Sequence, residues 1–254
     1  MGIETRRYGD YVTRSWRHFV PHKKRFEHID RVSHIIKDYD IVAIQEADAG
    51  SLRSGFINIV EYLARASKFP YWYSQCNRNL GRIAQHSNGF LSRFEVSFVH
   101  YHRLPGFIPG RGAMQVFLGN EDLPLVLFVV HLALGERGRK RQLAYLAQLC
   151  QGYENVVIMG DMNCSAEQVL YLMEQEGVEL DAYAEKGLAT FPSWAPKLHL
   201  DHILVSPTLK IKSIALYEEE ASDHLPMAME IEVSEALYQS IKTPKPQVRR
   251  GARV

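Results

Sequence analysis

The sequence predicts an α/β protein in which two β-sheets pack face to face with helices on the outside. Short apolar segments bounded by Gly, Pro or charged turns outnumber the helical segments, and the helical segments lie between them along the chain. Elements of both kinds bury their apolar faces most readily in layers. The 254 residues, 46% hydrophobic and 23% charged, allow a sizeable core and have ordinary globular composition.

Helical periodicity marks four segments. Residues 25–38 place apolar side chains on one helical face, and residues 139–150 repeat this pattern. Further helices are expected near residues 56–67 and 165–175. The strands are expected at residues 40–46, 88–93, 95–101, 112–119, 123–132, 155–161, 200–207, 211–218 and 225–233.

The chain is expected to form one domain over residues 1–239, followed by a flexible basic tail over residues 240–254. No repeat, linker or composition shift interrupts the first segment. The tail carries five Lys or Arg residues, no acid and two prolines. It could contact nucleic acid or anionic lipid, or simply be solvated. The overall net charge of +1 does not mark the body as a dedicated nucleic-acid binder.

The sequence favours a cytoplasmic protein without a membrane span. No apolar run reaches the length of a spanning helix, and the N-terminal residues lack the apolar stretch of a signal peptide. The cysteines, Cys76, Cys150 and Cys164, have neither zinc-ligand spacing nor an even number for disulfides. A reducing compartment therefore fits them best.

Polar side chains recur where apolar strands begin or end. A carboxylate at the buried end of a strand is costly unless it has a partner or a ligand. Taken singly, each residue has an ordinary explanation as a helix cap, a satisfied histidine or a turn residue. Because strand ends along one rim converge in space, the whole set instead predicts an active site there. The set comprises Glu46, His131, Asp161, Asn163, Asp201, Asp223 and His224.

Five segments resemble the endonuclease/exonuclease/phosphatase superfamily, in the family's order over roughly residues 25–233. They read IVAIQE, VVHLALGERGRKRQL, VVIMGDMN, TFPSWAPKLHLDHILVS and ASDHLPM. The resemblance implies a four-layer α/β/β/α sandwich of two mostly antiparallel sheets flanked by helices. It also implies a hydrolase of phosphoester bonds that uses Mg²⁺, or Mn²⁺, to assist the attack of water on phosphorus.

The resemblance also implies the roles of the residues at the strand ends. Glu46 would be the principal Mg²⁺ ligand, with Asp223 as a second metal contact, since Mg²⁺ needs only one or two carboxylates. His131 and Asn163 would donate hydrogen bonds to phosphate oxygens. Asp201 would pair with His224. Asp161 would orient or deprotonate the attacking water, and whether Asp161 or His224 takes the proton stays open.

Three further residues are candidates for substrate binding, each with an ordinary alternative. Asn88 could face the site or serve a turn, and Arg137 could reach phosphate or lie on the surface. Trp194 could stack on a base or a sugar, although a Trp in such a loop more often packs beneath its neighbours.

The start of the chain departs from the family pattern. Family members normally begin with a central strand that ends in an Asn supporting the metal, whereas no apolar run and no Asn precede Asn58 here. We therefore expect the first strand to have been clipped from this numbering. Three functions remain compatible: a phosphodiesterase or nuclease acting on DNA or RNA, a phosphatase acting on a small-molecule or lipid-headgroup phosphate, and a non-catalytic binding module.

Overall fold

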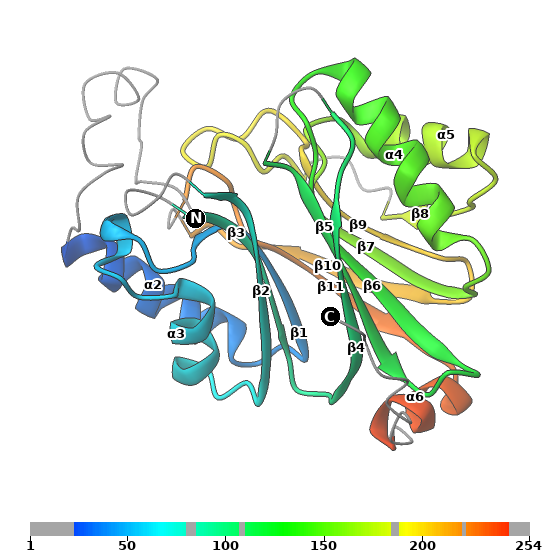
Figure 1. Ribbon diagram of the computed structural model, residues 1–254, viewed down its shortest axis with the longest axis horizontal. Coiled ribbons are helices and arrows are strands. Elements are labelled where there is room, and N and C mark those ends of the chain that lie inside the picture. The colour runs from blue at the N-terminus through cyan, green and yellow to red at the C-terminus, as the bar shows by residue number, and fades with distance from the viewer. Residues whose placement is uncertain (1–22, 80–84, 107–109, 184–187, 220–221, 244–254) are drawn as a thin grey trace.

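The computed structural model describes residues 23–243 except 80–84, 107–109, 184–187 and 220–221, and these form an α/β sandwich (Figure 1). Two layers of β-sheet lie between two layers of helix, as the sequence predicts. The helices are α2 (Lys23–Ile36), α3 (Ile59–Ala66), α4 (Glu136–Cys150), α5 (Ala166–Gln175) and α6 (Glu235–Lys242), with a short 3-10 helix η2 (Leu52–Ser54).

The first sheet layer consists of two separate pieces. One piece has the strand order β1-β3-β2, and the other is the hairpin β10-β11. All pairs in both pieces are antiparallel. The bounds are β1 (Ile41–Asp48), β2 (Tyr71–Asn79), β3 (Gln85–Ser92), β10 (Lys210–Leu216) and β11 (Met227–Glu232).

The second layer is a six-stranded sheet with the order β4-β5-β6-β7-β9-β8. Only β6 and β7 run parallel, and α4 connects them. The bounds are β4 (Val96–Arg103), β5 (Gly112–Gly119), β6 (Pro124–His131), β7 (Asn155–Asp161), β8 (Asp181–Ala182) and β9 (Asp201–Val205).

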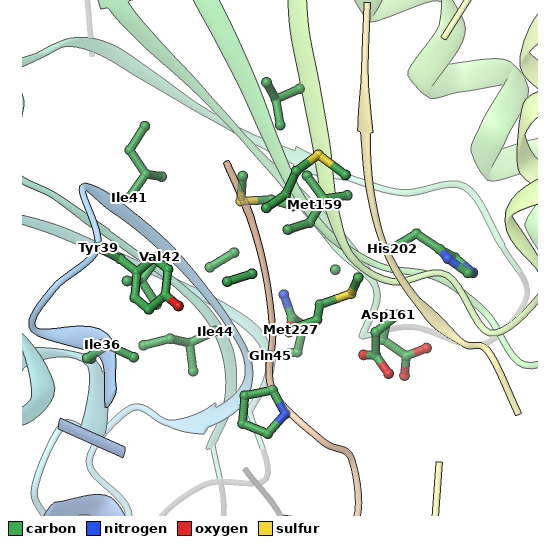
Figure 2. Close-up of a pocket in the computed structure, with 18 of the residues that line it drawn as sticks. Ile36, Tyr39, Ile41, Val42, Ile44, Gln45, Met159, Asp161, His202 and Met227 are labelled. Atoms are coloured by element: carbon green, nitrogen blue, oxygen red, sulfur yellow. The ribbon is translucent and has the colours of Figure 1, made fainter. Parts of the chain in front are cut away.

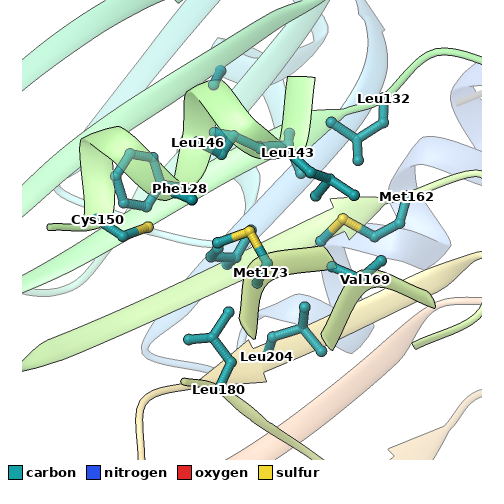
Figure 3. Close-up of a cluster of buried hydrophobic side chains, with 14 of the residues drawn as sticks. Phe128, Leu132, Leu143, Leu146, Cys150, Met162, Val169, Met173, Leu180 and Leu204 are labelled. Atoms are coloured by element: carbon teal, nitrogen blue, oxygen red, sulfur yellow. The ribbon is translucent and has the colours of Figure 1, made fainter. Parts of the chain in front are cut away.

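Three apolar cores hold the layers together. The first lies between the six-stranded sheet and helices α4 and α5, where Leu143, Met162 and Met173 are fully buried (Figure 3). The second lies between the two sheet layers and also receives Leu237 and Ile241 of α6. The third lies between β1-β3 and helices α2 and α3.

The predicted elements agree with the structure apart from one boundary and four additions, which are β2, β8, α6 and the short helix η2. β2 was not predicted, because its residues turn polar after the first three and give no clear alternation. The predicted tail boundary at residue 240 is wrong, since α6 extends to Lys242 and buries Ser240 and Ile241. The rest of the tail, residues 244–254, and the predicted clipped start within residues 1–22 lie outside the described residues.

No helix in the described part of the chain is both long and apolar enough to cross a membrane. The cysteines Cys76, Cys150 and Cys164 are all free thiols, the last two buried.

Candidate active site

Glu46 lies on a bulge of β1. Ile44 opposes Gly89 of β3 and Ala47 opposes Ser87, so two residues of β1 fit against one residue of β3. Glu46 itself has a φ of 55°, a conformation that non-glycine residues rarely adopt. Its side chain is 48% exposed. The bulge therefore turns this carboxylate out of the sheet.

Asp161 is the last residue of β7, and Asn163 follows two residues later. Gly160 precedes them with a φ of 138°, and a Cβ there would lie 2.0 Å from the carbonyl oxygen of Val130, so only glycine fits. Asn163 has a φ of 53°, which Asn tolerates better than most residues. Its backbone N–H donates to Asp161 Oδ1 at 2.9 Å, and its Nδ2 donates to the Leu132 carbonyl at 2.9 Å.

His131 lies between the carboxylates of Glu46 and Asp161. It ends β6 in register with Asp161 of the parallel strand β7. Its Nε2 lies 3.3 Å from Asp161 Oδ2, and its Nδ1 lies 3.9 Å from Glu46 Oε1. Burial, followed by the positive charge of Arg111, lowers the pKa of His131 to about 4. The ring is therefore neutral at pH 7.

Asp201 and His224 form an ion pair at the same end of the structure. His224 Nδ1 lies 2.7 Å from Asp201 Oδ2, and the hydroxyl of Thr190 donates to the same oxygen at 2.5 Å. The ring of Phe191 lies 4.9 Å from the His224 ring. Burial opposes the charge of His224, but the carboxylates, led by Asp201, outweigh it and raise its pKa to about 9.

The pKa of Asp161 lies well above that of an ordinary surface acid. Burial, followed by the negative charge of Asp201, raises its pKa to about 7, although His224 and Arg111 act against the increase. Asp161 can therefore accept a proton near neutral pH, while His224 holds one. Two neighbouring groups whose pKa values are displaced in this way are typical of an acid–base site.

Arg111 is a site residue that sequence reasoning missed. It lies just before β5, lines the same groove, and interacts electrostatically with Glu46 and Asp161. Burial lowers the pKa of its guanidinium, and these two carboxylates counteract that effect. The only sequence signal is a basic residue between two glycines before a strand, which does not indicate a site.

Asp48 supports the loop after Glu46 and was also missed. It is 3% exposed, and its carboxylate accepts hydrogen bonds from the backbone N–H of Gly50 and Ser51 at 3.0 and 2.6 Å and from the hydroxyls of Ser51 and Ser54 at 2.7 and 2.9 Å. Burial opposes its charge, but these hydrogen bonds outweigh burial and lower its pKa to about 2. An Asp followed by Ser three residues later is a turn signal that could have indicated it.

The predicted strand-end residues all line one groove of about 1170 Å³. Figure 2 shows Asp161 in this groove together with apolar side chains such as Ile41, Ile44 and Met227. Phe191 lines it as well and was not predicted. The predicted residues in the lining are Glu46, His131, Asp161, Asn163, Asp201, Asp223 and His224.

The three predicted substrate-binding residues are not part of this lining. Asn88 is 1% exposed, and its Nδ2 donates to the carbonyls of Gly112 at 3.1 Å and Val129 at 3.4 Å, which joins the two sheet layers. Arg137 lies exposed in the first turn of α4. Trp194 is half-buried in the loop that also carries Phe191.

The groove offers carboxylates that suit a hard divalent cation. Within the described residues, no three His, Cys, Asp or Glu side chains gather as ligands for one ion. Mg²⁺ needs fewer, because it keeps several waters and binds one or two carboxylates. Burial opposes the charge of Glu46, but positive groups that include Arg111 lower its pKa, so its exposed carboxylate is ionised at neutral pH. Glu46 supplies one such carboxylate, and Asp223 lines the same groove.

The fold is similar to that of several solved structures. A protein from Leptotrichia buccalis described as of the endonuclease/exonuclease/phosphatase family is 16% identical, with a TM-score of 0.68 over 83% of this chain and 95% of that one. A mannosyl-6-phosphatase from Bacteroides thetaiotaomicron is 18% identical, with a TM-score of 0.62 over 82% and 91%. D. rerio TDP2, in complex with a single-strand DNA product, is 16% identical, with a TM-score of 0.63 over 83% and 93%.

No curated protein sequence matches the chain. The family model described as "Endonuclease/Exonuclease/phosphatase family" matches residues 19–224. That range contains the strand-end residues from Glu46 to His224. The chain therefore belongs to the endonuclease/exonuclease/phosphatase family.

Proposed function

We propose that the protein hydrolyses phosphoester bonds with the help of a divalent cation, Mg²⁺ or alternatively Mn²⁺. The observation that carries this proposal is the pairing of Asp161, with a pKa of about 7, and His224, with a pKa of about 9, beside the carboxylate of Glu46. A base and an acid with displaced pKa values suit the attack of water on phosphorus.

Asp161 is the proposed base. It takes one proton from the attacking water as the new oxygen–phosphorus bond forms. The bond from phosphorus to the leaving oxygen breaks, and that oxygen keeps the electron pair and takes a proton from solvent. His224, which Asp201 keeps protonated, donates to an oxygen of the phosphoryl group and stabilises its charge. This assignment follows from the pKa order, because at pH 7 to 9 Asp161 is the group able to accept a proton.

The remaining groove residues bind phosphate in this proposal. Neutral His131 has a ring N–H to donate, and Asn163 Nδ2 carries two hydrogens, of which the Leu132 carbonyl takes one. Arg111 supplies a positive charge. Glu46 and Asp223 would hold the cation, which when bound draws charge from a phosphoryl oxygen.

A phosphodiester, in DNA or RNA, is the first candidate substrate, and a small-molecule or lipid-headgroup phosphate is the second. One structural neighbour is described as a mannosyl-6-phosphatase, and another, TDP2, is described in complex with a single-strand DNA product. A reducing, cytoplasmic location is proposed from the three free cysteines.

The proposal is tested with bis-p-nitrophenyl phosphate and p-nitrophenyl phosphate in Mg²⁺, in Mn²⁺ and after EDTA treatment. We expect activity that needs the cation and that Glu46→Gln and Asp161→Asn each abolish. Glu179→Gln and Asp122→Asn, both at exposed acids outside the groove, are the matched controls and should keep full activity.

The outcome of this assay separates the candidate functions. Faster turnover of the diester favours the nuclease-like activity, and assays with plasmid DNA and RNA would then identify the nucleic acid that is cleaved. Faster turnover of the monoester favours the phosphatase. Full activity in Asp161→Asn, or turnover that EDTA leaves unchanged, contradicts the mechanism. No turnover of any phosphoester by folded protein would favour the binding module.

A further inference from the structure

The edge strand β4 of the six-stranded sheet has few of the features that keep edge strands from pairing with other chains. Within the described residues β4 pairs only with β5, so its outer row of backbone N–H and C=O groups has no strand partner. Proteins usually protect such edges with lysines, prolines, bulges or very short strands. β4 has eight residues without Lys or Pro, and its single Arg, Arg103, is the last. A bulge interrupts its pairing with β5 between Val96 and Phe98 but leaves residues 98–103 regular.

Two other edge strands of the protein do carry these protective features. β8, at the opposite edge of the same sheet, has only two residues. β10 carries Lys210 and Lys212, and both lysines form ion pairs with Glu232. A short strand and a strand with charged side chains both resist pairing with a further strand. The contrast indicates that β4 is left open for a partner strand.

The strand β2, at the edge of the first sheet layer, lies beside β4 and enlarges the open surface. Gln75 Nε2 of β2 donates a hydrogen bond to the His102 carbonyl of β4 at 3.0 Å, so the two layers meet here. Three aromatic side chains of these two edge strands are exposed: Trp72 by 36%, Phe98 by 42% and Tyr101 by 53%. Aromatic residues are enriched where proteins bind one another. The two edges together therefore have the composition of a protein interface.

We propose that the partner is a second copy of this chain, whose β4 pairs antiparallel with β4 of the first and joins the two six-stranded sheets. A symmetric dimer brings the same strand of both copies together around a two-fold axis. If the axis passes through Val99, Glu95 of each copy lies opposite Arg103 of the other. Both side chains are exposed and carry opposite charges, so an ion pair forms at each end of the paired strands. The strand is therefore complementary to itself in charge.

The same register pairs aromatic rings across the two-fold axis. It places Phe98 of each copy opposite His100 of the other, on the same face of the joined sheet. Within one chain the centroids of these two rings already lie 4.2 Å apart in an edge-to-face arrangement. Cross-strand pairs of aromatic side chains stabilise antiparallel strands. The four rings of the two copies would form one cluster over the centre of the interface.

The size of this surface predicts a weak dimer. Eight residues of extended strand span about 27 Å, and packed sheets lie about 10 Å apart, so the two edges form a face of roughly 27 by 20 Å. Such a face buries roughly 500 Å² on each copy, close to the total of about 1,000 Å² that specific interfaces need. We therefore expect monomer and dimer to coexist at micromolar concentrations. No residue of β4 lines the groove of the candidate active site, so pairing leaves that site open.

The test measures the molar mass of the full chain in solution by light scattering, over about 1–200 µM protein. One chain has a mass of 29.1 kDa, and we expect the mean mass to rise toward twice that value as the concentration increases. We also expect hydrogen–deuterium exchange of the β4 amides to slow over the same concentration range, because pairing protects them.

An exchange of charges tests both the register and the identity of the partner. Glu95→Arg and Arg103→Glu each place like charges at both ends of the paired strands and should weaken the dimer about tenfold. The double variant restores opposite charges at both ends and should dimerise as the unchanged protein does. Because both side chains are exposed, these variants leave the cores intact.

A lysine on the open edge tests β4 itself. Phe98→Lys changes an exposed side chain, gives β4 the protection seen in β10, and should weaken the dimer at least about tenfold. Tyr171→Lys is the matched control, because it replaces a 60% exposed aromatic residue of α5 by the same lysine. It should dimerise as the unchanged protein does.

Several outcomes would overturn the proposal. A monomer at every concentration would exclude the second copy as the partner. A dimer that Phe98→Lys leaves unchanged would mean that another surface holds the two copies together. Slow exchange of the β4 amides at the lowest concentration, where the protein is monomeric, would mean that residues of the same chain cover this edge. A double charge variant that dimerises no better than the single variants would exclude the register centred on Val99.

Discussion

The Asp201–His224 pair makes the sharpest prediction about the candidate site. Asp201→Asn keeps the size of the side chain and removes its charge. Because Asp201 is the main cause of the raised pKa of His224, we expect the pKa of His224 to fall from about 9 toward its ordinary value of 6.5. In the proposed mechanism, the alkaline limb of the pH–rate profile moves to lower pH by as much as about 2.5 units.

The same displacement has a consequence for stability. A rise of about 2.5 pKa units corresponds to about 3 kcal/mol of preferential stabilisation of protonated His224 in the folded state. A group whose pKa is higher in the folded state contributes fully below its unfolded pKa of about 6.5. This contribution is lost as the pH rises through about 9. The unfolding free energy should therefore fall between pH 6.5 and 9, and Asp201→Asn should flatten that fall.

Three measurements check this reasoning. The His224 ring protons can be titrated by NMR, urea unfolding can be followed from pH 6 to pH 10, and kcat/KM can be measured over the same range. Thr190→Val is the matched control, because it removes one hydrogen bond to Asp201 Oδ2 but keeps both charges of the pair. It should leave the pKa of His224 near 9.

An unchanged His224 titration in Asp201→Asn would refute the electrostatic account. A pKa of His224 that falls while the alkaline limb stays in place would refute the role of protonated His224 in turnover. The acid limb should also move to lower pH, because Asp201 is one of the causes that raise the pKa of Asp161.

Two further predictions concern residues that sequence reasoning missed. Asp48→Asn should lower the free energy of unfolding at pH 7 by about 2.5 kcal/mol, because the pKa of Asp48 is lowered from 3.8 to about 2 in the folded protein. This loss should shrink as the pH falls toward 2. Equal losses at pH 7 and pH 2, measured by urea unfolding, would contradict the prediction. Arg111→Gln should reduce kcat/KM at least about tenfold and move the acid limb to higher pH, because Arg111 lowers the pKa of Asp161. Arg103→Gln, at an exposed arginine ending β4, is its control and should change neither.

Most of the fold could be predicted because its strands are short apolar runs with clear ends. β6 and β7 are nearly uniform runs of Val, Ile, Leu and Phe that end at His131 and Asp161, so both the strands and their polar ends could be located. β2 could not, because only its first three residues are aromatic and the polar residues after them give no alternating pattern. α6 was missed because Lys242 and the following basic residues concealed the apolar side chains Leu237 and Ile241.

Some residues of the candidate site could be predicted from the sequence and others could not. Residues at the ends of apolar strands could be found, since a carboxylate there is unusual. Arg111 and Phe191 could not, because their place in the groove depends on how loops pack in three dimensions. Asn88 was expected either to face the site or to serve a turn. It lies within β3 and faces the other sheet, where its amide bridges two backbone carbonyls.

The backbone at the site supports a functional interpretation more strongly than its residue types alone. Four non-glycine residues in the described part of the chain have positive φ, and two of them are Glu46 and Asn163. Each such conformation costs on the order of 1–3 kcal/mol, and glycine would remove most of that cost. Glycine would also remove the carboxylate from the β1 bulge and the amide from the end of β7. The side chains at these two positions, both bordering one groove, therefore support the proposal that Glu46 and Asn163 serve binding there.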